Sequence, residues 1–154
     1  MKSSLYLLEG VPRGIAVDAS CIPDLSSKKR DGYFHGRTEW QGVDLETGEK
    51  IISSSVYHRS TINLGEFCAI VDGLRWMDEN NKPNEPVWSD SKIAIDWVRS
   101  RTLRTYLPRT KETTDALFEA EAALAWLNSN RPDNPILWWN KYELGENPAD
   151  FGRK

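Results

Sequence analysis

The sequence contains few of the residues that build cysteine- or histidine-based sites. Its 154 residues include two cysteines, Cys21 and Cys68, and two histidines, His35 and His58. These numbers exclude a zinc finger or any other Cys/His metal cluster. One disulfide is possible on this count, but in a reducing compartment we expect both cysteines to be small buried thiols.

The sequence also lacks a long apolar run. No stretch approaches the roughly 20 apolar residues that span a membrane, and residues 1–9 have too short an apolar core for a secretory signal. We therefore expect a cytoplasmic protein with no membrane partner. The length suits one domain with a real core, so we predict a single domain over residues 1–154, with residues 1–13 as a lead-in or an extra edge strand. We favour a monomer.

An excess of positive charge is absent as well. The net charge is −3 and the pI is about 5.5, which argues mildly against a strong non-specific nucleic-acid binder. That argument weakens if a cluster of acids holds metal ions, because the ions reverse the local field. The basic run Lys28-Lys29-Arg30 is either a solvated loop or a contact for phosphate.

Four carboxylates lie at the edges of predicted elements: Asp18, Glu66, Asp90 and Asp150. Asp18 and Asp90 each follow a short apolar run that is typical of a buried strand. Glu66 lies in the first turn of a helical segment, where its structural role would be to favour the helix dipole. No run of Lys or Arg accompanies the four acids. This arrangement predicts a site for hard divalent cations, since Mg²⁺ and Mn²⁺ prefer oxygen ligands.

The hydrophobic pattern predicts an α/β fold with five strands. The predicted strands cover residues 14–19, 32–45, 50–58, 87–89 and 136–139. The first three form an antiparallel meander, and the helices that follow make right-handed crossovers to parallel strands. Asp18 and Asp90 would then leave adjacent parallel strands at the same edge of the sheet, where ligands bind in open α/β sheets.

Four helices are predicted, and the first three lie over residues 64–80, over residues 91–100 and from a cap at Thr113 or Thr114. Their predicted inward faces have helical spacing. The members are Phe67, Ile70, Val71, Leu74 and Met77 in the first, Ile93, Trp97 and Val98 in the second, and Leu117, Ala120, Leu124 and Leu127 in the third. Residues 140–146 are predicted to be a loop, and Pro148 is predicted to open a last short helix.

The acids occur in motifs that resemble those of a known family. The motifs are Asp18-Ala19-Ser20-Cys21, Ser60-Thr61-Ile62-Asn63-Leu64-Gly65-Glu66, Asp90-Ser91 and Asn147-Pro148-Ala149-Asp150. Together, and in this order, they resemble ribonuclease H of type 1 and, more broadly, the ribonuclease-H-like superfamily. The resemblance covers residues 14–154.

The resemblance implies a five-stranded mixed sheet whose first three strands are antiparallel. It also implies an endonuclease that uses two Mg²⁺ or Mn²⁺ ions to hydrolyse the RNA strand of an RNA–DNA hybrid. Asp18 would contact both ions, Glu66 and Asp90 would complete one site, and Asp150 would help to hold the other. Carboxylates packed together repel each other, so we predict at least one raised pKa in the metal-free protein and release of protons when metal binds.

The family also implies substrate contacts. By analogy, these are the backbone at Ala19, Ser20 and Cys21 together with the side chains of Asn63 and Lys92. Contacts to 2′-OH groups in a minor groove would select the RNA strand for cleavage. From the sequence alone, Asn63 is equally well explained as a polar loop residue or a helix cap.

The chain departs from the family pattern in three places, one of which is the spacing from Asn147 to Asp150, which is shorter than expected. Many members have a histidine in the loop before the last acid, whereas residues 140–146 contain none; Glu143 is the best substitute by position and Lys141 the second. The basic insertion with which some members hold the duplex is missing, and residues 101–111 are its candidate replacement. Two alternatives therefore stay open: another nuclease on the same fold, such as a resolvase or an exonuclease, and a non-catalytic hybrid-binding or interaction module.

Overall fold

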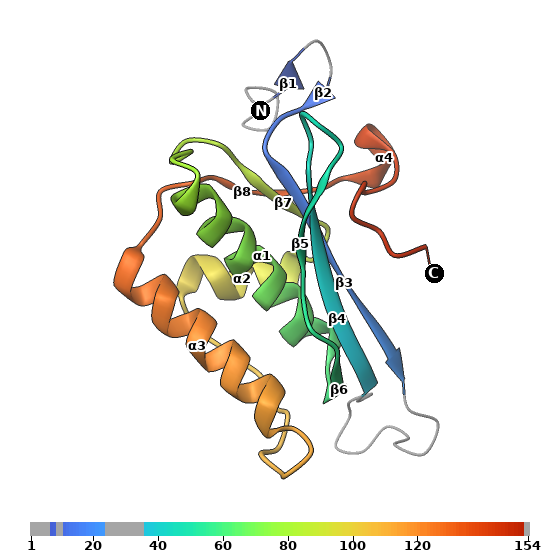
Figure 1. Ribbon diagram of the computed structural model, residues 1–154, viewed down its shortest axis with the longest axis vertical. Coiled ribbons are helices and arrows are strands. Elements are labelled where there is room, and N and C mark those ends of the chain that lie inside the picture. Colours follow the sequence, from blue (N-terminus) through green and yellow to red (C-terminus); the bar gives the residue numbers. More distant parts are fainter. Residues whose placement is uncertain (1–6, 9–10, 24–35, 153–154) are drawn as a thin grey trace.

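A mixed β-sheet with helices packed against it organises the chain (Figure 1). The computed structural model describes residues 7–8, 11–23 and 36–152. The strands are β1 (Leu7–Leu8), β2 (Val11–Pro12), β3 (Ile15–Pro23), β4 (Gly36–Asp44), β5 (Lys50–Ser53), β6 (Tyr57–Ser60), β7 (Val87–Ser89) and β8 (Ile136–Trp138). The helices are α1 (Ile62–Glu79), α2 (Lys92–Ser100), α3 (Thr114–Asn130) and α4 (Lys141–Leu144).

The strand order confirms the predicted fold class. The main sheet runs β5-β4-β3-β7-β8, and β6 pairs with the other end of β4. β3 and β4 are antiparallel, as are β4 and β5, whereas β7 lies parallel to both β3 and β8. β5 and β6 share one position beside β4, so the sheet has the five positions and the mixed pairing that the sequence predicts.

Strand β3 is longer than predicted, which changes the setting of Asp18. The sequence places Asp18 at the end of its strand, but β3 pairs with β4 continuously from Ile15 to Pro23. The strand that ends early is β7, which pairs with β3 only at Ile15 and Ala16. Asp18 therefore lies in the middle of its own strand, beside the edge that β7 leaves open.

The predicted strand over residues 50–58 is divided into β5 and β6. At the break, Trp40 of β4 pairs with Ser54 through one backbone bond and one side-chain bond. The N–H of Ser54 donates to the Trp40 carbonyl (3.0 Å), and the N–H of Trp40 donates to the Ser54 hydroxyl (2.9 Å). A side chain that takes the place of a backbone partner interrupts the ladder, as in a β-bulge.

The predicted inward faces of the helices are confirmed with one exception. The five predicted core residues of α1 are buried, and so are Trp97 and Val98 of α2 and Leu117, Ala120 and Leu127 of α3. Leu124 is partly buried against the core. Ile93 was predicted to face inward but is 53% exposed. Helix α2 instead buries Ala94 and Ile95, because its packing on α1 favours the neighbouring stripe.

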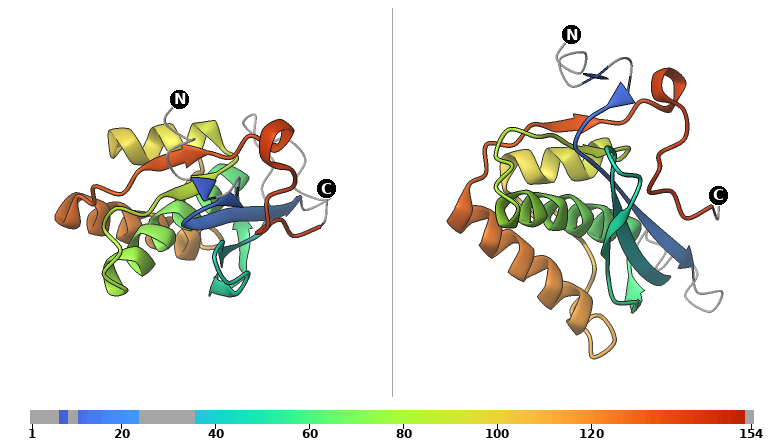
Figure 2. Two further views of the ribbon diagram at one scale, coloured as in Figure 1. Left: turned by 90° about the horizontal axis from the view of Figure 1, so that it is seen from above. Right: turned by 45° about the horizontal axis from the view of Figure 1, so that its top comes forward.

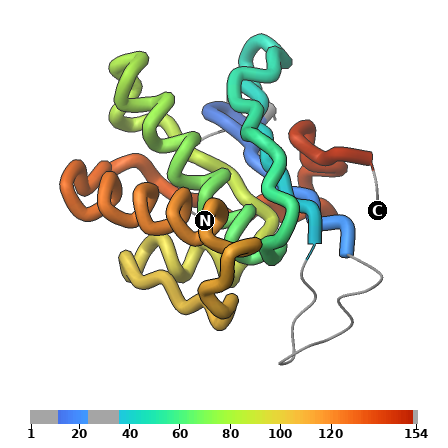
Figure 3. Tube along the Cα trace, turned by 60° about the horizontal axis from the view of Figure 1, so that its bottom comes forward, coloured from blue at the N-terminus to red at the C-terminus, as the bar shows by residue number. Residues whose placement is uncertain are grey.

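Helices α1 to α3 lie on one side of the β3–β4 pair, and the segment after β8 lies on the other (Figures 2 and 3). The side chains of β3 alternate between these two layers. Ile15, Val17 and Ala19 belong to the core under the helices, whereas Ala16 belongs to a second cluster with Trp88, Leu137 and Trp139. By this alternation, Asp18 shares the face of Ala16, the side on which the C-terminal segment lies.

The two ends of the described chain differ from the prediction. β1 and β2 pair with each other in a separate two-stranded sheet and do not extend the main sheet as an edge strand. Residues 141–144, predicted as a loop, form α4, because the Asn140 side chain accepts from the N–H of Tyr142 and caps its start. After Pro148, the described residues form a turn and not the predicted short helix.

Of the two histidines, His58 is exposed on β6. His35 and the run Lys28-Lys29-Arg30 lie outside the described residues. Within the described part of the chain, no helix is both long enough and apolar enough to cross a membrane.

Candidate metal centre

The site forms at the edge of β3 that β7 leaves open. Because β7 stops pairing at Ala16, the backbone groups further along this edge need other partners. The N–H of Ala19 donates to Oε1 of Glu66 at 2.9 Å. Glu66 belongs to α1, on the helical side of the sheet, so its carboxylate enters the sheet edge at the place where a neighbouring strand would otherwise continue.

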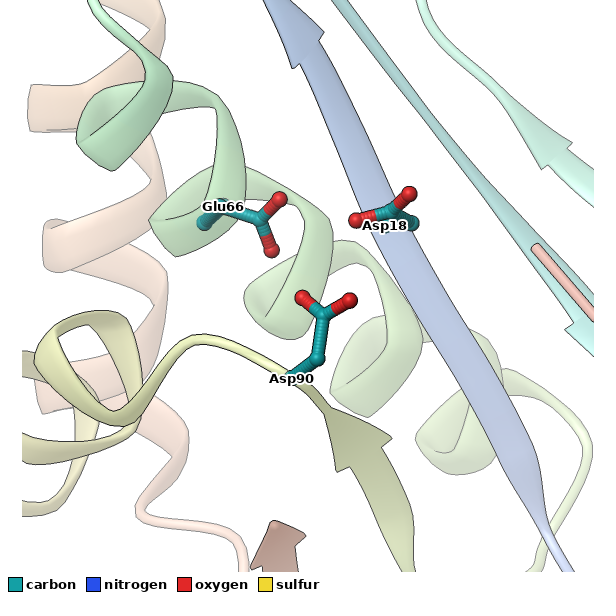
Figure 4. A group of neighbouring side chains, drawn as sticks. All are labelled: Asp18, Glu66 and Asp90. Atoms are coloured by element: carbon teal, nitrogen blue, oxygen red, sulfur yellow. The ribbon is translucent and has the colours of Figure 1, made fainter. Parts of the chain in front are cut away.

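Three carboxylates from three elements meet at this edge (Figure 4). Asp18 comes from β3, Glu66 from the second turn of α1, and Asp90 from the residue after β7. One oxygen from each lies within 4.8 Å of the other two. Asp18 and Glu66 are buried, and Asp90 is partly exposed. The sequence prediction that these three acids converge is therefore matched by the geometry.

The position of Glu66 is fixed by a second contact. The hydroxyl of Ser89 donates to Oε2 of Glu66 at 3.5 Å, and the same hydroxyl accepts from the N–H of Ser91 at 3.1 Å. Ser91 in turn caps α2, since its own hydroxyl accepts from the N–H of Ala94. The end of β7 and the start of α2 thus hold one oxygen of Glu66, while β3 holds the other.

Burial and charge raise the pKa of Glu66 well above its usual range. Removal from water is the largest cause, followed by repulsion from Asp18 and then from Asp90. A hydrogen bond with Asp18 acts in the same direction, and the N–H of Ala19 opposes them. The gathered charge is thus unfavourable in the protein alone, as the sequence predicts for carboxylates packed together.

The donor set fits a hard divalent cation. Mg²⁺ binds oxygen ligands at about 2.0–2.1 Å, so its ligand atoms lie close together around one ion. One oxygen from each of the three carboxylates lies within 4.8 Å of the other two, and all of their donor atoms are oxygen. A cation would also replace the mutual repulsion of the acids by attraction. The residues present are therefore suitable for Mg²⁺ or Mn²⁺.

Asp150 is not part of the group of three carboxylates, but the segment before it is hydrogen-bonded to the strands beside Asp18. The Nδ2 of Asn147 donates to the carbonyl of Val17 at 3.0 Å, again on the open edge of β3. Gln41, the register partner of Asp18 on β4, donates from Nε2 to the carbonyl of Ala149 at 2.6 Å. Asp150 thus follows a segment that is bound to both strands on the Asp18 face of the sheet.

Asn147 also shapes the backbone that carries Asp150. Its Oδ1 accepts from the N–H of Ala149 (2.9 Å), and its carbonyl accepts from the N–H of Asp150 (2.9 Å). Such a turn is the usual way in which an Asn side chain directs the following backbone. Asn147 is buried, and the turn keeps Asp150 next to β3.

The other predicted site residues differ in how far they are buried. Ala19 and Ser20 are buried and Cys21 is partly buried along β3. Asn63 is partly exposed in the first turn of α1, whose cap is Thr61 and not Asn63. Lys92, in the first turn of α2, is exposed, and its Nζ lies 4.0 Å from the centre of the Trp138 ring. Glu143 is exposed on α4 and outside the group of three.

Four residues that support the site were not predicted as site residues. They are Gln41, Ser89, Trp138 and Asn147. Asn147 could have been identified from the sequence, because it belongs to the motif of the last acid. Ser89 was less easily identified, and the only indication was a hydroxyl directly before Asp90. Gln41 and Trp138 act through strand register and packing, which the sequence does not display.

No family model matches the chain. Among solved structures, the chain is similar to several ribonucleases H. It is 15% identical to LC11-RNase H1 in complex with an RNA/DNA hybrid, with a TM-score of 0.49, and the match covers 84% of this chain and 86% of that chain. It is 12% identical to RNase H1 from Halobacterium salinarum NRC-1, with a TM-score of 0.43 and the same two coverages.

A third similar structure is the N-terminal RNase H domain of a Mycobacterium tuberculosis protein, fused to maltose binding protein. Here the identity is 13%, the TM-score is 0.44, and the match covers 82% of this chain and 86% of that chain. At these identities and TM-scores, the similarity by itself assigns no activity or substrate to this chain.

Proposed function

We propose that this chain is a ribonuclease H of type 1, a metal-dependent endonuclease that hydrolyses the RNA strand of RNA–DNA hybrids. The observation that carries this proposal is the convergence of Asp18, Glu66 and Asp90 at the open edge of β3. The order of the acids along the chain and the motifs around them support the same family. A module that only binds nucleic acid has little reason to gather carboxylates whose proximity is unfavourable.

Asp18, Glu66, Asp90 and Asp150 are the proposed ligands of two Mg²⁺ or Mn²⁺ ions. Two bound divalent ions would supply an activated water and a stabilised leaving oxygen at the phosphodiester. Asp18, between Glu66 and the Asp150 segment, is the carboxylate suited to contact both. Ala19 and Ser89 keep Glu66 oriented toward the open edge through their hydrogen bonds.

The Asp150 carboxylate is proposed to enter the metal site from the side of the sheet on which the C-terminal segment lies. The bonds from Asn147 and Gln41 keep its segment against β3 and β4. Its Oδ2 accepts from the N–H of Gly152 at 3.1 Å. A movement of this side chain toward Asp18 would add a fourth carboxylate to the site.

Glu143 is proposed to take the proton-handling role of the histidine found in many family members. Helix α4, which carries it, follows Trp139, whose N–H donates to the carbonyl of Ser89 at 2.7 Å. The indole of Trp139 also donates to the carbonyl of Gly145 and closes the segment around α4. Glu143 is exposed and therefore accessible to water.

Recognition of the hybrid is proposed to use five residues near the acids in the sequence motifs. They are the β3 backbone at Ala19, Ser20 and Cys21, together with the side chains of Asn63 and Lys92, which belong to the first turns of α1 and α2. The N–H of Ala19 is already bound to Glu66. Contacts with 2′-OH groups at this position would direct cleavage to RNA.

The test is cleavage of a labelled RNA–DNA hybrid with Mg²⁺ or Mn²⁺. Double-stranded DNA, double-stranded RNA and both single strands serve as substrate controls. We expect internal cuts confined to the RNA of the hybrid, loss of cutting in Asp18→Asn, and unchanged cutting in Asp78→Asn. Asp78 is an exposed acid outside the site, so the second variant controls for the change in charge.

The other outcomes separate the alternatives. Cutting of DNA in place of the hybrid would retain the metal site but indicate another nuclease on the same fold. Binding of the hybrid by a folded protein with no cutting in either metal would favour the non-catalytic module. Cutting by Asp18→Asn at the wild-type rate would contradict the proposed site itself.

A further inference from the structure

A pocket of the described chain lies away from the three acids. It encloses about 520 Å³, and its lining residues come from the ends of α2 and α3 and the beginning of β8. Ile136, in its wall, pairs with Val87 at the start of β7, whereas Asp90 follows the other end of that strand. Its volume is in the range of pockets that hold small molecules, roughly 300–1,000 Å³.

The lining of this pocket carries charge of one sign. Three arginines contribute to it, Arg99, Arg101 and Arg131, and none of its lining residues is Asp or Glu. None of the three makes a salt bridge with a residue that the structure describes. Arg99 donates from Nη2 to the carbonyl of Ile136, which directs one guanidinium along the pocket wall.

Two of these arginines have a backbone conformation that favours glycine. Arg101 and Arg131 follow the last residues of α2 and α3 with φ values of 51° and 43°. Glycine adopts this left-handed conformation at helix ends without the steric penalty of a side chain. A long cationic side chain at both positions, directed to one pocket, indicates that the side chains have a use there.

The floor of the pocket is apolar. It includes Val98, Leu127 and Leu137, and Pro132 and Pro135 form part of the wall. The site thus combines an apolar surface for a ring or chain with a cationic rim for an anion. Guanidinium groups match the oxygens of phosphate through paired hydrogen bonds.

We propose that this pocket binds a small organic phosphate of the nucleoside monophosphate class. Three guanidinium groups suit a phosphate dianion better than a single carboxylate, which would leave more of the positive charge unmatched. The apolar floor and the prolines would contact the base or sugar. This site is separate from the metal centre and does not depend on the function proposed for it.

A purely structural role is the competing explanation for the arginines. Cations at the carboxyl ends of helices offset the partial negative charge there, an effect of about 0.3–1 kcal/mol. That role predicts a small loss of stability when an arginine is removed and no effect of a ligand. The two explanations therefore differ in what calorimetry would detect.

The experiment is isothermal titration calorimetry of the full chain with AMP in EDTA, which keeps divalent metals out. Adenosine and inorganic phosphate are titrated in parallel. The variants are Arg101→Gly and Arg131→Gly, with Asn81→Gly as the matched control, because Asn81 has the same left-handed backbone (φ 55°) but does not line this pocket. Asp18→Asn controls for binding at the metal centre.

We expect AMP to bind more tightly than phosphate, and adenosine not to bind. Each Arg→Gly variant should lose about tenfold or more in AMP affinity, because a charge-assisted hydrogen bond is removed. Its melting temperature should hold or rise, since glycine suits the backbone. Asn81→Gly and Asp18→Asn should stay within about twofold of wild type.

Three results would overturn the proposal. The first is AMP affinity that survives in both Arg→Gly variants. The second is equal binding of adenosine and AMP, which would leave the arginines without a role. The third is AMP binding that disappears in Asp18→Asn, which would place the ligand at the metal centre.

Discussion

At the scale of single residues, Glu66 shows how the site is held in an unfavourable state of charge. Its two oxygens accept from the N–H of Ala19 and the hydroxyl of Ser89, so its orientation is set from both sides. Burial and the neighbouring Asp18 and Asp90 raise its pKa. The protein alone thus tolerates a repulsion that a divalent cation would relieve.

This repulsion gives Glu66→Gln an expected effect on stability. Below the ordinary glutamate pKa, folded and unfolded chains both carry the proton. Between that value and the raised folded pKa, only the folded chain keeps it, so the free energy of unfolding falls as pH rises through this window and stays low above it. In EDTA at higher pH, Glu66→Gln should be more stable than wild type by about 1–2 kcal/mol. Urea unfolding over a pH series measures this difference.

The exposed Glu79→Gln is the control for that series. It should follow the wild-type pH dependence, because Glu79 lies at the solvent-facing end of α1. If Glu66→Gln also followed the wild-type curve at every pH, the unfavourable charge assigned to Glu66 would be wrong.

The second prediction for a single residue concerns Asn147, which holds the segment before Asp150. Asn147→Ala removes the donor to the Val17 carbonyl and the acceptor for the Ala149 N–H. A buried group left without its partner costs about 1–3 kcal/mol, and Asp150 loses the turn that holds it. We expect that loss in urea unfolding, together with a fall in hybrid cleavage measured at a temperature where the variant is still folded.

Asn128→Ala, on the exposed surface of α3, is the matched control and should change stability by less than about 0.5 kcal/mol. Full cleavage by a folded Asn147→Ala would show that Asp150 does not need this turn.

At the scale of elements, the site depends on how closely α1 approaches the sheet. Gly65, next to Glu66, makes this approach possible. A Cβ at Gly65 would lie 2.7 Å from Cγ2 of Thr38 and 3.1 Å from Cβ of Ala19. The Ala19 Cβ moves only with its backbone, so any larger residue must displace the start of α1 from β3.

Gly65→Ala should therefore weaken both the fold and the site. Overpacking of this kind costs about 1–3 kcal/mol, and the displacement would lengthen the bond from Ala19 to Glu66. Thermal unfolding and a Mn²⁺ titration measure the two effects. Gly73→Ala, later in the same helix, meets methyl groups of Val87 at 3.0 and 3.3 Å and of Val17 at 3.4 Å and should leave Mn²⁺ affinity unchanged. Equal effects of the two variants on Mn²⁺ affinity would contradict this account.

The helices and strands also differ in how far the sequence could predict them. Helix α1 was predictable because its buried residues repeat with helical spacing from Leu64 to Met77. Helix α4 was not, since its four residues have no periodic pattern and it depends on the Asn140 cap. The division of β5 from β6 depends on Ser54 binding Trp40, a contact between strands that a single strand's pattern does not contain.

At the scale of the whole molecule, the topology explains why distant acids meet. Asp18 and the Asp150 segment lie on one face of the sheet, and Glu66 comes from the helix on the other. They approach one another because β7 ends at Ser89 and leaves the β3 edge open. The parallel crossover from β3 to β7, which was predictable from the order of the elements, also brings Asp90 to this edge.

The sequence did not predict the contacts that hold the site residues in position. The convergence of Asp18, Glu66 and Asp90 followed from strand ends and a helix start. The position of Asp150 required Gln41, whose role depends on its register opposite Asp18. Likewise, the contact of Lys92 with Trp138 joins residues that only the neighbouring β7 and α2 bring together.

The whole account depends on the claim that Asp18, Glu66 and Asp90 form one divalent cation site. Titration of Mn²⁺ into the metal-free chain, followed by electron paramagnetic resonance, tests it most directly. The account predicts that wild type and Asp78→Asn bind Mn²⁺ alike, and that Asp18→Asn binds at least about tenfold more weakly because a carboxylate ligand is lost. Equal Mn²⁺ affinity of Asp18→Asn and wild type would contradict it.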